Sequence, residues 1–161
     1  NHGELTNADS IHFPDSLKYK TLRKGRTVYG GGGIMPDYFI PLDTARYTKF
    51  HRELTAKGAI VNADLKFIDK YRKKIRREYA SFDKFKTRFE TPQELIELVL
   101  AEREKVGVKP KDEEELQKTL PELKLQMKAL IARDIWDMSE YFAVMYEENP
   151  FVKKAIELLE R

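Results

Sequence analysis

The clearest helical pattern in the chain is Leu123-Lys124-Leu125-Gln126-Met127-Lys128-Ala129-Leu130-Ile131-Ala132-Arg133-Asp134-Ile135. Its apolar residues recur every three or four positions, which is the spacing that lines one side of an α-helix. The pattern continues past this segment, so we expect one long apolar stripe, made of Leu123, Met127, Leu130, Ile131, Ile135, Met138, Phe142 and Met145. An apolar stripe of this length must be covered by other helices, so it predicts a multi-helix domain.

Start and stop signals place further helices before this segment. We expect a helix capped by Asp43 or Thr44 and ended by Gly58 in the left-handed conformation. A longer helix should follow to about Tyr79, and Ser81 should cap a short third one.

The same signals continue toward the C-terminus. Thr91-Pro92-Gln93-Glu94 matches a capping box, and the helix that it begins should stop at Gly107. A polar helix over 112–119 should end before Pro121, and Asn149-Pro150 should begin the last helix.

The composition of the 161 residues is that of a globular protein with a charge-rich exterior, with 41% hydrophobic and 35% charged residues. The net charge of +3 is too small to indicate nucleic-acid binding by itself. The absence of cysteine excludes disulfides and thiolate metal sites. No apolar run approaches the ~20 residues of a membrane span, so we expect no such span.

The composition changes near Asp43. Residues 1–43 hold six of the eight glycines and the strand-like runs, of which Thr27–Tyr29 and Tyr38–Ile40 are the expected strands. Residues 44–161 carry the helical signals. The sequence therefore predicts a mostly α protein, with a short β-rich part over 1–43 and a multi-helix domain over 44–161.

Four consecutive glycines, Gly30 to Gly33, stand between the expected strands. Ordering four glycines is costly, so such a run belongs where a backbone or a ligand must approach closely. It is no phosphate loop, because Gly31 and Gly32 stand where that loop needs Lys and Ser or Thr. It is no dinucleotide fingerprint either, because Met35 takes the place of the third glycine.

The run from Gly25 to Asp37 closely resembles the closing segment of carboxyl-terminal processing (tail-specific) proteases, the Bacteroidetes type in particular. Gly-Ile-x-Pro-Asp is the specific part of this motif, and 125–134 resembles the long C-terminal extension of the same family. The matching motif residues, which the resemblance implies to be structural or close to the substrate groove, are Gly30, Gly31, Gly32, Gly33, Ile34, Pro36 and Asp37.

Members of that family cleave proteins near their C-termini with a serine nucleophile and a lysine base. A PDZ domain, the serine and the lysine all precede the Gly-Ile-x-Pro-Asp segment there, and none of their motifs occurs here. The resemblance therefore implies a non-catalytic C-terminal portion with a scaffolding, docking or regulatory role. It also implies a periplasmic or cell-envelope location, and as partners the rest of the protease domain, its protein substrates and another copy of the chain.

A basic run gives an alternative of another class, an autonomous helical module that binds an acidic partner. Its cations are Lys70, Arg72, Lys73, Lys74, Arg76 and Arg77. Tyr71 and Ile75 lie four residues apart and should face the core, which leaves the cations on the solvent side. We expect no nucleic-acid binding, because acidic segments elsewhere balance this charge.

The remaining candidates for chemistry are weak. Ser81 and Lys84 have the Ser-x-x-Lys spacing of acyl-enzyme hydrolases, but Ser81 fits equally well as a helix cap. The three histidines are scattered without metal-ligand spacing, and Trp136 is expected to anchor a core or an interface. We therefore expect no catalytic residue, metal or cofactor in this chain. Its start at Asn1, without Met, is expected to be internal.

Overall fold

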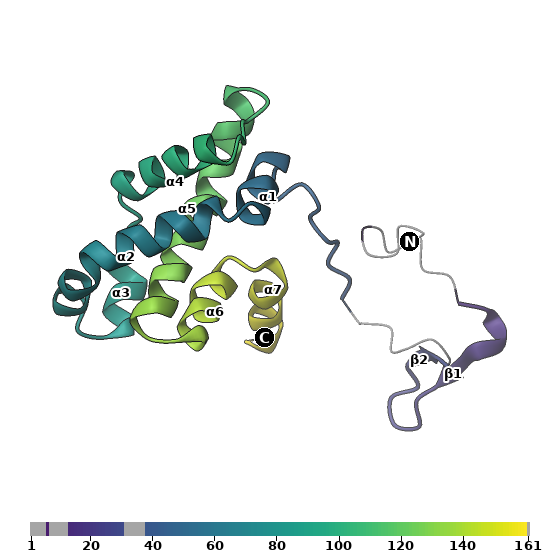
Figure 1. The fold of residues 1–161 in the computed structure, drawn as a ribbon. Coiled ribbons are helices and arrows are strands. Elements are labelled where there is room, and N and C mark those ends of the chain that lie inside the picture. The colour runs from purple at the N-terminus through teal and green to yellow at the C-terminus, as the bar shows by residue number, and fades with distance from the viewer. Residues whose placement is uncertain (1–5, 7–12, 31–37, 161) are drawn as a thin grey trace. The chain divides into compact units, whose positions relative to one another are not determined.

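The computed structural model describes residue 6, residues 13–30 and residues 38–160. Their contacts divide the chain into two compact units, Asn1–Thr44 and Ala45–Arg161. The protein is mostly α-helical, with one short two-stranded sheet near the N-terminus (Figure 1), so the expected fold class is confirmed.

The first unit contains an antiparallel pair of strands, β1 (Lys18–Lys20) and β2 (Thr27–Tyr29), in which Tyr19 pairs with Val28. The turn between them is closed by Thr21, whose amide and hydroxyl both bond to Arg26, and by Gly25 at φ 60°. The expected strand at Thr27–Tyr29 is confirmed.

The second expected strand, Tyr38–Ile40, is wrong, because the structure assigns these residues no strand. The partner of Thr27–Tyr29 comes from before it in the sequence and is β1, which is only three residues long and therefore gives little sequence signal.

The second unit is a helical bundle in which α2 lies across α5 (Figure 1). Helix α5 also packs against α1 and α6, while α2 packs against α4 on its other side. The helices are α1 (Lys49–Ala56), α2 (Ala59–Glu78), α3 (Phe82–Arg88), α4 (Gln93–Lys105), α5 (Glu113–Ile135), α6 (Met138–Glu147) and α7 (Pro150–Leu159).

Several helix ends lie where the sequence predicts them. Gly58 and Gly107 end α1 and α4 with φ values of 75° and 67°, in the left-handed region that glycine adopts without strain. The Ser81 hydroxyl accepts a hydrogen bond from the amide of Lys84, and the Asn149 side chain caps α7.

Two expected caps are wrong. Helix α1 is capped by Thr48, whose hydroxyl accepts from the His51 amide, instead of by Asp43 or Thr44. The capping box at Thr91 does not form, because the Thr91 hydroxyl donates to the Lys124 carbonyl of α5 at 2.7 Å. Both threonines also contact α5, since the Thr48 hydroxyl lies 2.6 Å from that of Thr119.

Pro121 does not end a helix, since α5 runs through it. Proline removes the hydrogen bond to the carbonyl four residues earlier, here that of Gln117. Pro121 and Gln117 are both exposed, so water can satisfy that carbonyl. The packing of α5 on both sides of this point holds the helix together across the gap.

The expected single apolar stripe is also broken. The helix stops at Ile135, and Asp137 caps a new helix, α6, by accepting from the Ser139 amide at 2.6 Å. This break changes the phase of the helix, so Val144 is buried whereas Met138 and Phe142 face outward. Of the stripe beyond the break, only Met145 packs against the core, and it is partly buried.

The core is formed by α1, α2, α4 and α5 around residues with no exposed surface, among them Leu54, Ile60, Leu95, Leu123, Met127 and Ile131. An aromatic group extends it at the α3 end, where Trp136 lies 5.2 Å from Phe85 between ring centroids.

We expect Leu123→Ala to lower the free energy of unfolding by about 2–5 kcal/mol, because it leaves a cavity inside the bundle. Leu65→Ala is the matched control, since Leu65 is 48% exposed and should change stability by about 0.5 kcal/mol at most. Urea denaturation followed by circular dichroism measures both. Equal losses in the two variants would contradict this placement of the core.

Candidate interaction surface

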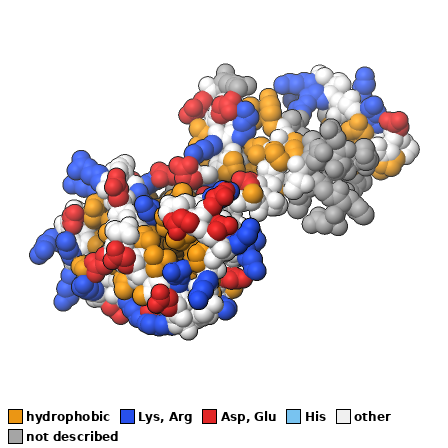
Figure 2. Space-filling model, turned by 90° about the horizontal axis from the view of Figure 1, so that it is seen from above, with side chains coloured by type: hydrophobic (Ala, Val, Ile, Leu, Met, Phe, Trp, Pro, Cys, Tyr) orange, Lys and Arg blue, Asp and Glu red, His pale blue; other side chains and the backbone are white. Residues whose placement is uncertain are grey.

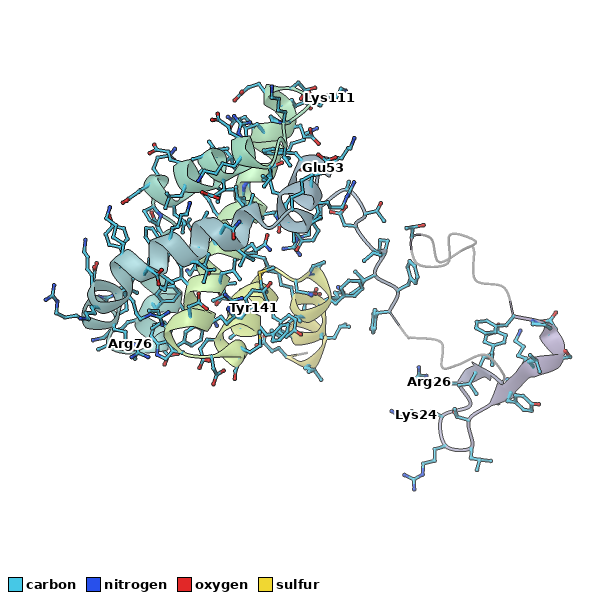
Figure 3. The ribbon with its side chains drawn as sticks, in the orientation of Figure 1. Lys24, Arg26, Glu53, Arg76, Lys111 and Tyr141 are labelled. Carbon is cyan, nitrogen blue, oxygen red and sulfur yellow. The ribbon has the colours of Figure 1, made fainter. Side chains whose placement is uncertain are left out.

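The predicted basic face of α2 is split by the packing of the helix. Arg72 donates to the carbonyl oxygen of Asp134, and Arg76 donates to that of Ile135 at 2.9 Å. Both carbonyls belong to the last turn of α5, whose free carbonyls carry partial negative charge. Arg76 lies at the C-terminal end of α2 (Figure 3), and the two arginines thus bind α5 within the same chain.

Two lysines of the same face gather around Tyr71. Lys70 Nζ lies 3.0 Å from Glu94 Oε1 and 4.8 Å from the centre of the Tyr71 ring, and Lys74 lies 6.0 Å from it. The Tyr71 hydroxyl donates to Glu94 at 2.7 Å. Hydrogen bonds from Tyr71 and Lys70 lower the pKa of Glu94, so this group keeps its charge and stabilises the pairing of α2 with α4.

The last two cations of the face, Lys73 and Arg77, are exposed. On the side of the molecule that Figure 2 shows, Lys and Arg side chains are interspersed with Asp and Glu side chains. The six cations are close together in the sequence, but they point in different directions from the helix.

A buried acidic group, Asp64, lies where α2 faces α5. The side chain of Asp64 has no exposed surface, and its Oδ2 lies 3.4 Å from Arg133 Nη2. Burial, and then a hydrogen bond with Asp134, raise the pKa of Asp64 to about 8, against the weaker opposing charges of Arg133 and Arg72. Asp64 is therefore a carboxyl group that holds its proton near neutral pH.

Asp64 was not among the residues that the sequence singles out, although a signal existed. It stands four residues after Ile60 and four before Ile68, in the middle of an apolar stripe. A carboxylate at a core-facing position requires a partner or a shifted pKa.

The remaining candidates have structural roles. The Ser81 hydroxyl is occupied as the cap of α3, and Lys84 is exposed. His51 is buried, with its Nε2 2.6 Å from Gln126 Oε1, and burial lowers its pKa. No group of three or more His, Cys, Asp or Glu residues that could hold a metal occurs among the residues described, and no helix in that part of the chain is long and apolar enough to cross a membrane.

A hollow of about 240 Å³ lies where α2 meets the start of α4. Aromatic and charged side chains line it in equal number, the aromatic ones being Phe67, Tyr71, Tyr79 and Phe89 and the charged ones Lys74, Glu78, Glu90 and Glu94. Lys70 and Lys74 lie over the Tyr71 ring that lines this hollow, and Lys70 also pairs with Glu94.

Helices α6 and α7 carry most of the exposed large apolar side chains of the helical unit. Met138, Phe142 and Tyr146 follow one another at every fourth position of α6, and the Phe142 and Tyr146 rings stack at 5.6 Å. Helix α7 adds further exposed side chains. We call this set the α6–α7 apolar face, and it consists of Met138, Phe142, Tyr146, Phe151, Ile156 and Leu159.

This face is unusual for a monomer because its members are large and three of them follow one another along α6. Every one is at least 43% exposed, and Leu159 is 86% exposed. Grouped apolar side chains in water mark an interaction site, whereas single ones need no explanation.

Of the glycine motif, the structure describes only Gly30. Its amide donates to the Leu17 carbonyl at 2.7 Å, and a Cβ at this position would lie 2.8 Å from the Tyr19 ring. Close approach of a side chain thus accounts for this glycine. The other motif residues, Gly31, Gly32, Gly33, Ile34, Pro36 and Asp37, lie outside the described residues.

Comparison with known families gives one match, to a family of unknown function, DUF8443, over residues 50–137. The match covers more than half of the chain. The chain belongs to this family. The DUF8443 region runs from α1 to the end of α5, and α6 and α7 follow it. No curated protein and no solved structure matches the chain.

We expect Arg76→Ala to lower the free energy of unfolding by about 1 kcal/mol, because the last turn of α5 loses a charged hydrogen-bond donor. Arg77→Ala is the control, since Arg77 is exposed and its truncation should change stability by less than about 0.5 kcal/mol. Denaturation curves at low salt compare them. An equal effect would mean that the guanidinium of Arg76 does not stabilise α5.

The pKa of Asp64 makes stability depend on pH. Its pKa is about 8 in the folded protein and 3.8 ordinarily, so the unfolded chain releases this proton first as pH rises. The contribution of Asp64 to stability is therefore complete below 3.8 and is lost progressively up to about pH 8.

Asp64→Asn should remove this loss, so the variant should gain stability over the wild type as pH increases from about 5 to about 8. Asp69→Asn, at an exposed position of the same helix, is the control. Urea denaturation at a series of pH values gives the difference between variant and wild type, which cancels the titration of His51. A difference that does not change with pH would contradict the raised pKa.

Proposed function

We propose that this chain is the non-catalytic C-terminal portion of a serine endopeptidase that cleaves proteins near their C-termini. Its helical unit serves as a scaffold that binds a protein surface through the α6–α7 apolar face. The observation that carries the scaffolding role is the exposure of that face. The resemblance of residues 25–37 to tail-specific proteases supports the choice of enzyme.

The physical argument rests on the cost of leaving this face in water. Burial of apolar surface is worth about 25 cal/mol per Å², so a fully covered Phe or Leu side chain contributes about 1.5–3 kcal/mol. The bundle core is complete without this face, because the large core side chains of α1 to α5 are already buried. These exposed side chains are therefore explained better by a partner than by the stability of the bundle.

The roles of the chemical groups support a non-catalytic role. Ser81 is a helix cap, His51 is bound to Gln126, and Asp64 is buried among α2 and α5. Catalysis requires a nucleophile, a base and an oxyanion site that converge on one accessible place. We assign these groups to the part of the enzyme that precedes this segment, and we assign the enzyme to the periplasm or the cell envelope.

The alternative, a module that binds an acidic partner through the basic face of α2, is less well supported. Arg72 and Arg76 bind α5, and Lys70 binds Glu94. Lys73, Lys74 and Arg77 would have to supply the attraction.

The native protein tests the proposal. We expect the species in its natural source, isolated through an antibody against the helical unit, to be several hundred residues longer than this chain. Intact mass and N-terminal sequencing should show the extra length before Asn1, with a PDZ domain and an upstream Ser and Lys.

A control for proteolysis is the same isolation in the presence of protease inhibitors. A native species that begins at or near Asn1 under those conditions would overturn the proposal, and it would favour an independent interaction module.

A further inference from the structure

Helix α7 (Pro150–Leu159) has only a few partly buried side chains, so it makes little contact with the rest of the bundle. It is amphipathic, yet none of its residues is buried. Ile156 is 50% exposed and Leu159 is 86% exposed, while Val152 and Leu158 are half-buried. A helix of ten residues has little stability alone in water, so the apolar side of α7 requires a covering surface.

The charges of α7 indicate what that surface is. Lys153 and Glu160 stand seven residues apart, so they lie on the same flank of the apolar side with opposite signs. The basic residues of α7 lie toward its N-terminus. Its first turn contains no acidic residue, and its last turn contains no basic residue. This order opposes the dipole of the helix itself.

An antiparallel copy of the same helix complements this order. In an antiparallel pair related by a two-fold axis, each flank of one helix faces the same flank of the other helix. The N-terminal part of one flank then lies against the C-terminal part of the other. Lys153 then lies opposite the second copy's Glu160, and Glu160 opposite the second copy's Lys153. The two helix dipoles are also antiparallel in this arrangement, which is favourable.

We propose that two copies of this chain pair through antiparallel α7 helices. The two-fold axis passes beside Ile156, which contacts its own counterpart, and Leu159 packs against the second copy's Val152. The exposed α6 stripe of Met138, Phe142 and Tyr146 extends the contact. This inference deepens the proposed scaffolding role of the same face and rests on it.

The pair is a weak one. A helix of ten residues is about 15 Å long, so two such helices and their α6 neighbours form an interface at the low end of the specific range. We therefore expect a reversible dimer that appears as protein concentration rises to about 100 µM.

Exchange of charges tests this arrangement. Lys153→Glu and Glu160→Lys each place like charges opposite each other twice in the symmetric pair. Each variant alone should dimerise about three- to tenfold more weakly than the wild type. An equal mixture should recover the wild-type affinity as a heterodimer, because the two exchanged positions then face each other with opposite charges.

Sedimentation equilibrium of the full chain over a concentration series gives the affinities, and native mass spectrometry of one tagged and one untagged variant identifies the heterodimer. Lys153 also lies 2.6 Å from Glu148 in its own chain, so Glu160→Lys controls for the loss of that pair. The double variant with both exchanges should dimerise like the wild type.

Apolar variants give a second arm. Ile156→Asp should abolish the dimer while circular dichroism stays unchanged, because no residue of α7 is buried. Leu65→Asp, at a 48% exposed position of α2, should leave the dimer intact. A wild-type chain that stays monomeric at about 1 mM, or a dimer indifferent to Ile156→Asp and to the charge exchanges, would overturn the proposed pairing.

These failures are distinct from failure of the proposed function. A monomeric chain whose native form carries an upstream protease domain would overturn the pairing alone. A dimeric chain whose native form begins near Asn1 would overturn the protease assignment alone.

Discussion

The burial of α5 from several sides is the constraint on which the helical unit depends. Its apolar residues before Ile135 contact α1 and α2, and α6 folds back along it. An α-helix that is apolar over this much of its surface is stable only when neighbours exclude water from it. The course of α5 through Pro121 follows from this burial, because packing on both sides replaces the one hydrogen bond that proline removes.

Burial of α5 also explains where charges lie inside the unit. The last carbonyl groups of α5 have no hydrogen-bond partner within the helix. Arg72 and Arg76 of α2 donate hydrogen bonds to two of them. Asp64 faces the same helix and meets Arg133 and Asp134, but removal from water raises its pKa despite these neighbours. The run of cations suggests a binding face in the sequence, but two of its members hold α2 against α5 within the same chain.

The periphery has a different character from the core. The region that matches DUF8443 ends with α5, and most of the exposed large apolar side chains of the helical unit belong to the two helices after it. The core helices bury most of one another's apolar surface, whereas α6 and α7 leave several large apolar side chains exposed to water. The proposed scaffolding role agrees with the places of the candidate groups that the structure describes, since Ser81 is a helix cap and His51 and Asp64 are buried.

The sequence by itself determined the helical class, the ends at Gly58, Gly107 and Asn149, and the strand at Thr27–Tyr29, because these depend on local backbone preferences. It did not reveal that Thr48 and not Asp43 caps α1, that Asp137 breaks the apolar stripe, or that Met138 and Phe142 face outward. Those outcomes depend on which segments pack together, and a one-residue change of helix phase turns a side chain by about 100°. Tertiary structure alone decided that Arg72 and Arg76 bind α5 and that Asp64 is buried, because the partners of these charges lie about 60 to 70 residues away in the sequence.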